Sequence, residues 1–142
     1  MLLRTFGAYI DDSPELFLPL VPYFTQQLVL SGAVLWEQDD LADGLYLIES
    51  GSLRATYSYL DHRELVQETM VAGTVAGDLS TLSDTKRNAT VIAERDCVLW
   101  KLDTDALSRL EEDLPRVARR FTRLVLKGER LRVVQMDLAN KE

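Results

Sequence analysis

Residues 77–90 read Gly-Asp-Leu-Ser-Thr-Leu-Ser-Asp-Thr-Lys-Arg-Asn-Ala-Thr, and this stretch decides the fold. Gly77 and Asp78 lead into a short run that is compatible with a helix, and Arg87 follows nine residues after Asp78. A phosphate is bound by backbone N–H groups at the start of a helix and by a guanidinium that can donate two parallel hydrogen bonds. A carboxylate beside them can accept a hydrogen bond from a sugar hydroxyl. The stretch therefore has the parts that a sugar phosphate requires.

The composition is that of one globular domain. The chain has 142 residues, of which 46% are hydrophobic and 27% charged, so it is long enough to bury a core. No apolar run reaches the roughly 18 to 20 residues that span a bilayer, and the first residues lack the apolar core of a signal peptide. The one cysteine, Cys97, excludes an internal disulfide, and we expect it to serve in packing.

The charge is acidic overall but unevenly distributed. A net charge of −7 argues against nucleic acid as a partner, because the neutralisation of phosphates dominates that affinity. Half of the 16 basic residues lie from residue 116 onward: Arg116, Arg119, Arg120, Arg123, Lys127, Arg130, Arg132 and Lys141. They form either a solvated helix face or a docking surface for an acidic partner, including the acidic barrel of the same protein.

The middle of the chain predicts short strands. From residue 28 to residue 100, apolar segments alternate with turn signals such as Ser31-Gly32, Asp43-Gly44 and Ser50-Gly51. Residues 52–59 alternate with period two, and residues 45–49 read as a buried strand. We expect seven or eight antiparallel strands in a sandwich or barrel, interrupted by the excursion of residues 75–90.

Helical patterns flank the strands. Residues 12–15 read as a helix start, followed by short helical pieces that Pro19 and Pro22 interrupt. After Asp103 we expect one helix that breaks near Pro115 and a longer helix after it. We therefore predict one domain over residues 1–142, with a helical lead-in at 1–30, a β-roll at 31–103 and C-terminal helices at 104–138.

Residues 77–81 and 87–90 resemble the phosphate-binding cassette of the cyclic-nucleotide-binding domain family. That cassette reads Gly-Glu-Leu-Ala-Leu and leads, nine residues after the Glu, to Arg-Ala-Ala-Thr. A second block matches the family's Gly-x-x-Leu, Asp-x-x-Tyr-x-Ile and Gly-x-Leu spacing, through Gly32, Leu35, Gln38, Asp43, Gly44, Tyr46, Ile48, Gly51 and Leu53. The resemblance extends over nearly the whole chain. It implies a mainly β fold, an antiparallel β-roll or jelly roll of about eight strands with an N-terminal helical segment and C-terminal helices.

The resemblance also implies roles for individual residues. Arg87 would pair with the exocyclic phosphate oxygens of cAMP or cGMP, and Asp78 would accept the ribose 2′-hydroxyl. Asn88 stands where family members carry alanine, or threonine when guanine is preferred. The ligand-binding residues implied in this way are Gly77, Asp78, Leu79, Ser80, Arg87, Asn88 and Ala89, with backbone N–H groups near Leu79, Ser80 and Ala89 completing the cradle. Occupancy of the site would then move the C-terminal helices, which makes the domain a regulatory module.

The chain departs from the family pattern at several positions. Asp78 is one methylene shorter than glutamate, which removes about 1.5 Å of reach. Ala76 replaces a phenylalanine, and Asp39 stands where a glycine is expected. These changes leave a second interpretation open. Arg87 would form an ordinary salt bridge to Asp78 or Asp84 in an empty cassette, and the domain would be a ligand-free scaffold that docks to other domains.

A second resemblance concerns the parent protein. Residues 5–9 and 71–74 are similar to the cyclic-nucleotide-type domain that follows the STAS domain in fungal sulfate-permease-like transporters. This resemblance implies a cytoplasmic module of a larger membrane transporter, with other domains of that transporter as partners.

Catalysis and DNA binding are not expected. The β-roll enzymes nearest in architecture, the cupins, hold a metal with several histidines and a glutamate, and this chain has one histidine, His62. Because His62 is the one histidine of the sequence, any Ser-His-Asp arrangement would have to use it. Only about ten residues follow Arg132, too few for a helix-turn-helix after the long helix.

Overall fold

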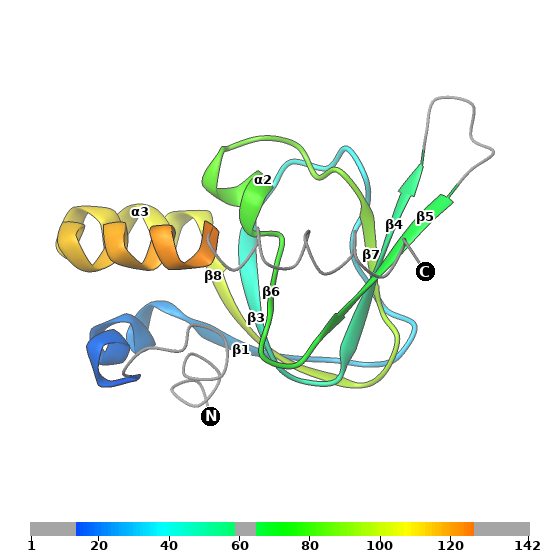
Figure 1. Cartoon of the computed structure of the whole chain (residues 1–142), viewed down its shortest axis with the longest axis horizontal. Coiled ribbons are helices and arrows are strands. Elements are labelled where there is room, and N and C mark those ends of the chain that lie inside the picture. The colour runs from blue at the N-terminus through cyan, green and yellow to red at the C-terminus, as the bar shows by residue number, and fades with distance from the viewer. Residues whose placement is uncertain (1–13, 59–64, 127–142) are drawn as a thin grey trace, which may run out of the picture.

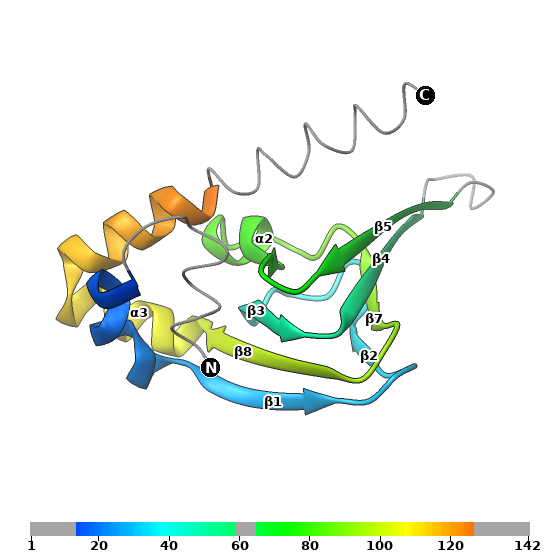
Figure 2. The same ribbon diagram turned by 60° about the horizontal axis from the view of Figure 1, so that its bottom comes forward.

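The computed structural model describes residues 14–58 and 65–126, and two four-stranded antiparallel sheets dominate them (Figure 1). One sheet has the order β1-β8-β3-β6 and the other β2-β7-β4-β5. The bounds are β1 Thr25–Val29, β2 Val34–Trp36, β3 Gly44–Ser50, β4 Ser52–Ser58, β5 Leu65–Val71, β6 Val75–Ala76, β7 Thr90–Ala93 and β8 Cys97–Asp103. The sheets face each other as a roll (Figure 2), so the predicted mainly β fold is confirmed.

Strand β3 is the centre of the first sheet. It pairs with β8 from Gly44 opposite Asp103 to Ser50 opposite Val98, and with β6 on its other edge. Five successive residues from Gly44 are buried, as expected for a strand covered on both faces. The next strand, β4, shows the predicted alternation, because Leu53 and Ala55 are buried between less buried neighbours.

The turn between β3 and β4 depends on Gly51. Its φ of +91° lies in the region that side chains avoid. A Cβ atom at this position would lie 2.5 Å from the backbone oxygen of Asp96, so the close approach of the two chain segments requires glycine.

The helices pack together at one end of the roll. The 3-10 helix η1 (Pro14–Tyr23), helix α3 (Thr104–Asp113) and the helical residues 115–126 lie on the same side in Figures 1 and 2. Leu20, Leu110 and Phe121 are fully buried in one shared core. Asp103 caps α3, because its Oδ1 accepts a hydrogen bond of 2.7 Å from the backbone N–H of Ala106.

Two details of the predicted division differ from the structure. The break near Pro115 is confirmed, since α3 ends with Leu114 as its C-cap. The predicted helical lead-in at 1–30 is wrong for residues Thr25–Val29, which form β1 and pair with β8. The preceding helical segment is a 3-10 helix, consistent with Pro19 and Pro22 removing two backbone donors. Residues 1–13, 127–138 and His62 lie outside the described residues.

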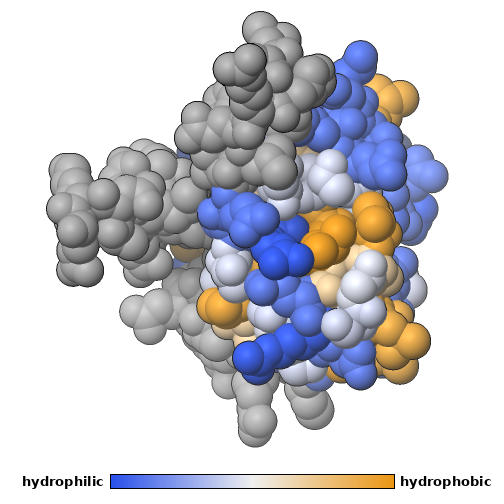
Figure 3. Space-filling model, turned by 90° about the vertical axis from the view of Figure 1, so that its right-hand side faces the viewer, coloured by the Kyte–Doolittle hydropathy of each residue, from blue (hydrophilic) through white to orange (hydrophobic). Residues whose placement is uncertain are grey.

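Figure 3 shows the face of the molecule on which β4 and β5 lie, the right-hand side of Figure 1. Polar residues on this face surround separate apolar patches. Large apolar side chains that are exposed in the described residues are Leu18, Leu28, Leu30, Val34, Leu41 and Val71. Cys97 is buried, and its burial raises the pKa of the thiol, which agrees with the packing role expected from the sequence. Among residues 14–58 and 65–126, we find no helix with the length and apolarity needed to cross a bilayer.

Candidate functional site

The segment between β6 and β7 forms the candidate site. After β6 the chain passes Gly77, enters the short helix α2 (Asp78–Leu82) and returns through Arg87 to β7. Gly77 has a φ of +74°, and a Cβ atom there would lie 2.4 Å from Nη1 of Arg87 and 2.9 Å from the ring of Trp36. Glycine is therefore required at position 77 for the guanidinium to lie against the backbone.

Arg87 points inward and is almost completely buried, with 1% of its surface exposed. Its Nη1 atom donates to the backbone oxygen of Gly77 at 3.0 Å, and contacts the hydroxyls of Ser80 and Thr81 at 3.1 and 3.3 Å. In the family motif quoted above, alanine and leucine occupy the positions of these two hydroxyl residues. The chain thus supplies the guanidinium with oxygen acceptors that the motif lacks.

The other terminal nitrogen of Arg87 is held from β3. Nη2 donates to the backbone oxygen of Gly44 at 2.6 Å and to Oδ1 of Asp43 at 2.9 Å. The sequence offered Asp78 or Asp84 as the salt-bridge partner of Arg87. That expectation is wrong, because the carboxylate that pairs with Arg87 in the described part of the chain is Asp43.

A ring of aromatic and cationic contacts fixes the same guanidinium. The Cζ atom of Arg87 lies 3.9 Å from the centre of the Trp36 ring, and that ring stacks on Tyr46 with centroids 5.6 Å apart. Lys101 lies over Tyr46 and donates to Oδ2 of Asp43 at 2.9 Å. Asp43 therefore closes the ring between the two cations.

The charges of this ring shift one another's pKa values. Desolvation lowers the pKa of Arg87, although Asp43 opposes the shift; arginine remains charged. Partial desolvation raises the pKa of Asp43, but the hydrogen bonds and charges of Lys101 and Arg87 together bring it below its usual range. Lys101 loses some hydration, yet its bond to Asp43 and its contacts with Tyr46 raise its pKa overall. Each shift of Asp43 and Lys101 favours the ion pair.

One donor of Arg87 stays unused within the described residues. The Nε atom is buried and has no hydrogen-bond partner there. A guanidinium has five N–H groups, and the own-chain acceptors occupy the four on Nη1 and Nη2. An anion that approaches Arg87 therefore finds the Nε–H group open and must displace an own-chain oxygen to form a bidentate pair.

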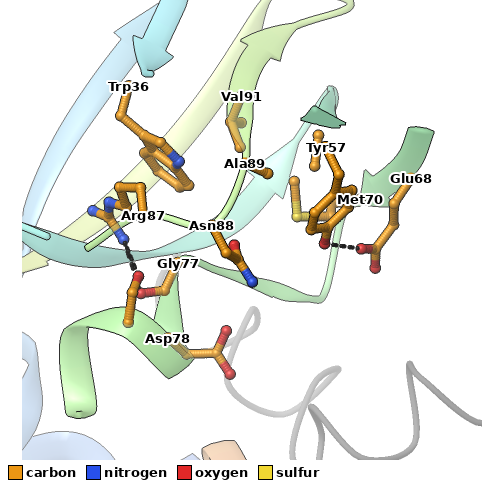
Figure 4. Close-up of a pocket in the computed structure, with 12 residues that line it drawn as sticks. Trp36, Tyr57, Glu68, Met70, Gly77, Asp78, Arg87, Asn88, Ala89 and Val91 are labelled. Atoms are coloured by element: carbon orange, nitrogen blue, oxygen red, sulfur yellow. Dashed lines mark hydrogen bonds between the residues drawn. The ribbon is translucent and has the colours of Figure 1, made fainter. Parts of the chain in front are cut away.

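A cavity of about 50 Å³ lies between this segment and the second sheet. Its lining comes from two sides, the segment after β6 and the strands β2, β4, β5 and β7: Trp36, Ala55, Tyr57, Glu68, Met70, Gly77, Asp78, Ser80, Arg87, Asn88, Ala89 and Val91. Asp78 is 1% exposed, and Figure 4 shows its carboxylate and Asn88 on the side away from the Arg87 guanidinium. Pockets for small ligands commonly measure about 300–1,000 Å³, so a nucleotide must widen this cavity.

Six of the seven residues named from the sequence line this cavity, and Leu79 lies beside them in α2 with a side chain outside the described set. Their role in binding stays a prediction. Trp36, Tyr57 and Glu68 were missed. Period two along β4 and β5 could have placed Tyr57 and Glu68 on the inner face, because they lie two residues from the buried Ala55 and Met70.

Comparison with known proteins gives a consistent result. The sequence profile of the cyclic nucleotide-binding domain matches residues 26–113. The cyclic AMP receptor protein of Thermus thermophilus is 29% identical over 120 residues, which cover 84% of this chain and 56% of that protein. The vacuolar basic amino acid transporter VSB1 of Saccharomyces cerevisiae is 33% identical over 101 residues, covering 66% of this chain and 9% of the transporter.

The fold comparison agrees with the sequence comparison. A cyclic nucleotide-binding domain from Methylobacillus flagellatus superposes with a TM-score of 0.81 at 19% identity, covering 94% of this chain and 80% of that one. The match spans 56% of the length of the receptor protein and 9% of the length of the transporter. Profile, relatives and topology together show that this chain belongs to the cyclic nucleotide-binding domain family.

Proposed function

We propose that the domain is a regulatory module that binds a cyclic nucleoside monophosphate, either cAMP or cGMP, in the cavity beside Arg87. The buried Nε–H group of Arg87 carries this proposal, because it has no partner in the described residues. A buried donor without a partner costs about 1–3 kcal/mol, and a phosphate oxygen that accepts from it recovers that free energy. Family membership supports the same ligand class.

The sugar side of the ligand faces Asp78. This carboxylate is buried, lines the cavity and lies beyond Arg87 in the direction of the second sheet (Figure 4). A ribose hydroxyl placed there donates to Asp78 while the phosphate is held by Arg87. The shorter side chain of aspartate requires the ribose to lie closer to α2 than a glutamate would.

Asp43 couples the site to the C-terminal helices. Its side chain binds Arg87, and its backbone oxygen accepts a hydrogen bond of 3.0 Å from Thr104 at the first residue of α3. A phosphate that draws Arg87 away from Asp43 therefore acts on the residue that anchors α3. The ligand shifts the position of the helices only by its difference in affinity for the two arrangements.

Calorimetric titration of the purified domain with cAMP and with cGMP tests the proposal. We expect saturable binding that Arg87→Lys weakens strongly, because lysine keeps the charge but loses the Nε–H group and the planar fork. Asp78→Asn should weaken binding as well. The matched control is Arg119→Ala, which removes an exposed arginine from the helical residues 115–126 and should leave the affinity unchanged. A folded wild-type domain that shows no binding at millimolar nucleotide contradicts the proposal.

A second function is favoured by the Ser80 and Thr81 hydroxyls. These hydroxyls already accept hydrogen bonds from Arg87. The guanidinium therefore has acceptors within the chain that the alanine and leucine of the family motif do not provide. In this alternative the domain binds no nucleotide and docks to other domains of a cytoplasmic assembly, such as a larger membrane transporter. Similarity to part of VSB1 supports that setting. The test is association with the neighbouring domain in the presence and absence of salt, with charge reversal of Arg116 and Arg123 expected to weaken it.

A further inference from the structure

A second hollow lies on the outer face of the roll and is called the outer groove below. Its volume is about 380 Å³, within the range of about 300–1,000 Å³ that is usual for pockets of small ligands. It shares no lining residue with the cavity beside Arg87, because successive residues of β5 face opposite sides of the sheet. The residues that line the outer groove are Gly51, Ser52, Thr69, Val71, Glu94 and Arg95.

Three segments of the chain meet at the outer groove and fix its backbone. The N–H of Glu94 donates to the backbone oxygen of Ser52 at 3.0 Å, and Ser52 lies opposite Val71 in the pairing of β4 with β5. The backbone oxygen of Glu94 accepts a hydrogen bond of 2.9 Å from the hydroxyl of Ser31. The turns between β3 and β4 and between β7 and β8 lie at the bottom of Figure 1, whereas α2 lies at the top. The loop that carries Glu94 and Arg95 is therefore held in place before any ligand arrives.

The outer groove holds two opposite charges that do not pair. Oε1 of Glu94 is buried and has no hydrogen-bond partner in the described residues. Arg95 is exposed, and within the described part of the chain no ion pair joins its side chain to Glu94 or to another carboxylate. Withdrawing a carboxylate oxygen from water without a donor costs free energy, and a ligand that supplies the donor recovers it.

The other lining residues supply neutral polar groups and an apolar contact. Ser52 and Thr69 carry hydroxyls, each of which can donate one hydrogen bond and accept others. Val71 is 52% exposed, so its apolar surface is open to a ligand. The outer groove thus combines an anion, a cation, two hydroxyls and an apolar side chain.

The two charges define the class of ligand. A simple anion would be attracted by Arg95 but repelled by Glu94, and a simple cation would meet the reverse. A zwitterion satisfies both charges, since its ammonium donates to Glu94 and its carboxylate accepts two parallel hydrogen bonds from Arg95. We propose that the outer groove binds a free α-amino acid with an apolar side chain, which packs on Val71. This inference is independent of nucleotide binding beside Arg87.

Titration calorimetry of the whole chain with leucine and three leucine derivatives tests the inference. N-acetyl-leucine lacks the ammonium, leucinamide lacks the carboxylate, and N-acetyl-leucinamide lacks both charges. We expect saturable binding of leucine, with the first two derivatives at least about tenfold weaker, as the loss of one charge-assisted hydrogen bond implies. The third derivative should not bind measurably.

Two variants assign each charge of the ligand to its partner. Glu94→Gln should bind leucine about tenfold more weakly than the wild type does, and the difference between leucine and N-acetyl-leucine should largely disappear. Arg95→Gln should likewise remove most of the difference between leucine and leucinamide. Glu112→Gln and Arg119→Gln are the matched controls, because they make the same changes at exposed helical residues and should leave the affinity unchanged.

Three results would overturn the inference. The first is a folded chain that binds no leucine at millimolar concentration, whatever the result with nucleotides. The second is equal affinity for leucine and N-acetyl-leucinamide, because that result assigns the groove to an apolar side chain or a peptide segment rather than to a zwitterion. The third is an unchanged ratio between leucine and leucinamide in Arg95→Gln. This last comparison also decides the matter if Glu94→Gln does not fold, because Arg95 is exposed and its replacement leaves the core intact.

Discussion

Oδ1 of Asp43 lies 2.9 Å from Nη2 of Arg87, although 44 residues separate them in the chain. Asp43 directly precedes β3 of the first sheet, whereas Arg87 lies between α2 and β7. The contact therefore joins the candidate site to β3. Strand β3 pairs with β8, and β8 leads directly into α3. Three of the predictions below follow from how Arg87 is held.

Replacing Asp43 with asparagine should reduce stability in a pH-dependent way. Lys101 and Arg87 hold the pKa of Asp43 below its usual range, so its stabilising effect is present above the unfolded value of about 3.9 and is lost as pH falls through the folded value. The Asp43 side chain is 62% exposed, so we expect a loss of about 1 kcal/mol or less at neutral pH. Urea unfolding at pH 7 and pH 3 measures it.

In that experiment the difference between wild type and Asp43→Asn should be smaller at pH 3 than at pH 7, because pH 3 lies below the unfolded pKa and the linked stabilisation has begun to be lost. Glu112→Gln on α3 is the control, because Glu112 is exposed and remote from Arg87. A difference that stays constant between the two pH values contradicts the assignment of Asp43 as the ionised partner.

Removing the hydroxyls that contact Arg87 should separate stability from affinity. In the double variant Ser80→Ala, Thr81→Val, Nη1 keeps Gly77 but loses two acceptors. We expect the free energy of unfolding to fall by about 1–3 kcal/mol. The affinity for cyclic nucleotide should rise by up to about tenfold, since the phosphate no longer competes with these oxygens.

Calorimetry and urea unfolding of the same double variant measure both effects. Ser83→Ala serves as the control, because that hydroxyl contacts Thr85 rather than Arg87. If stability falls while the affinity also falls, the two hydroxyls support ligand binding and do not compete with it.

The fold was predictable from the sequence where local rules determine it. The alternation that buries Leu53 and Ala55 follows from strand periodicity, and the end of α3 follows from Pro115. The strand Thr25–Val29 was missed because its five residues, Thr-Gln-Gln-Leu-Val, carry one apolar pair. Its pairing partner, β8, lies about 70 residues further along the chain.

The candidate site was predictable in its residues but not in its contacts. The spacing of Gly77 and Arg87 indicates which residues converge. The predicted salt-bridge partner of Arg87 was wrong, because Asp43 reaches Arg87 only through the pairing of β3 in the sheet. Similarly, the contact between Tyr57 and Glu68 depends on the register of β4 against β5, which no local pattern sets.

Replacing Asp39 with glycine should stabilise the domain. Asp39 has a φ of 75°, and the family pattern has glycine at this position. A non-glycine residue in the left-handed region costs about 1–2 kcal/mol, of which glycine's greater unfolded entropy offsets a part. We expect a gain of about 0.5–1 kcal/mol in thermal or urea unfolding. The backbone N–H of Asp39 keeps its bond to the Arg87 oxygen.

The neighbouring substitution Asp40→Gly is the control for Asp39→Gly. Asp40 has no positive φ, and its Oδ2 accepts a hydrogen bond of 2.9 Å from the backbone N–H of Glu37. Glycine there should destabilise the domain by about 1 kcal/mol, because the bond is lost and no strain is relieved. Stabilisation by both glycines would point to a general effect on the loop.

Replacing Gly77 with alanine should displace Arg87 and abolish nucleotide binding. The added Cβ meets Nη1 of Arg87 and the ring of Trp36 at distances that real contacts do not show, and the φ of +74° adds backbone strain.

Gly32→Ala is the matched control, since its φ is +89° but nothing lies within 4 Å of the added atom. Both variants carry the backbone cost of about 1–2 kcal/mol, and only Gly77→Ala carries the clash. Unfolding measures the first effect, and titration together with Trp36 fluorescence measures the second, because the guanidinium stacks on that ring. Gly77→Ala that binds nucleotide as tightly as Gly32→Ala would show that the ligand does not need Arg87 in its observed position.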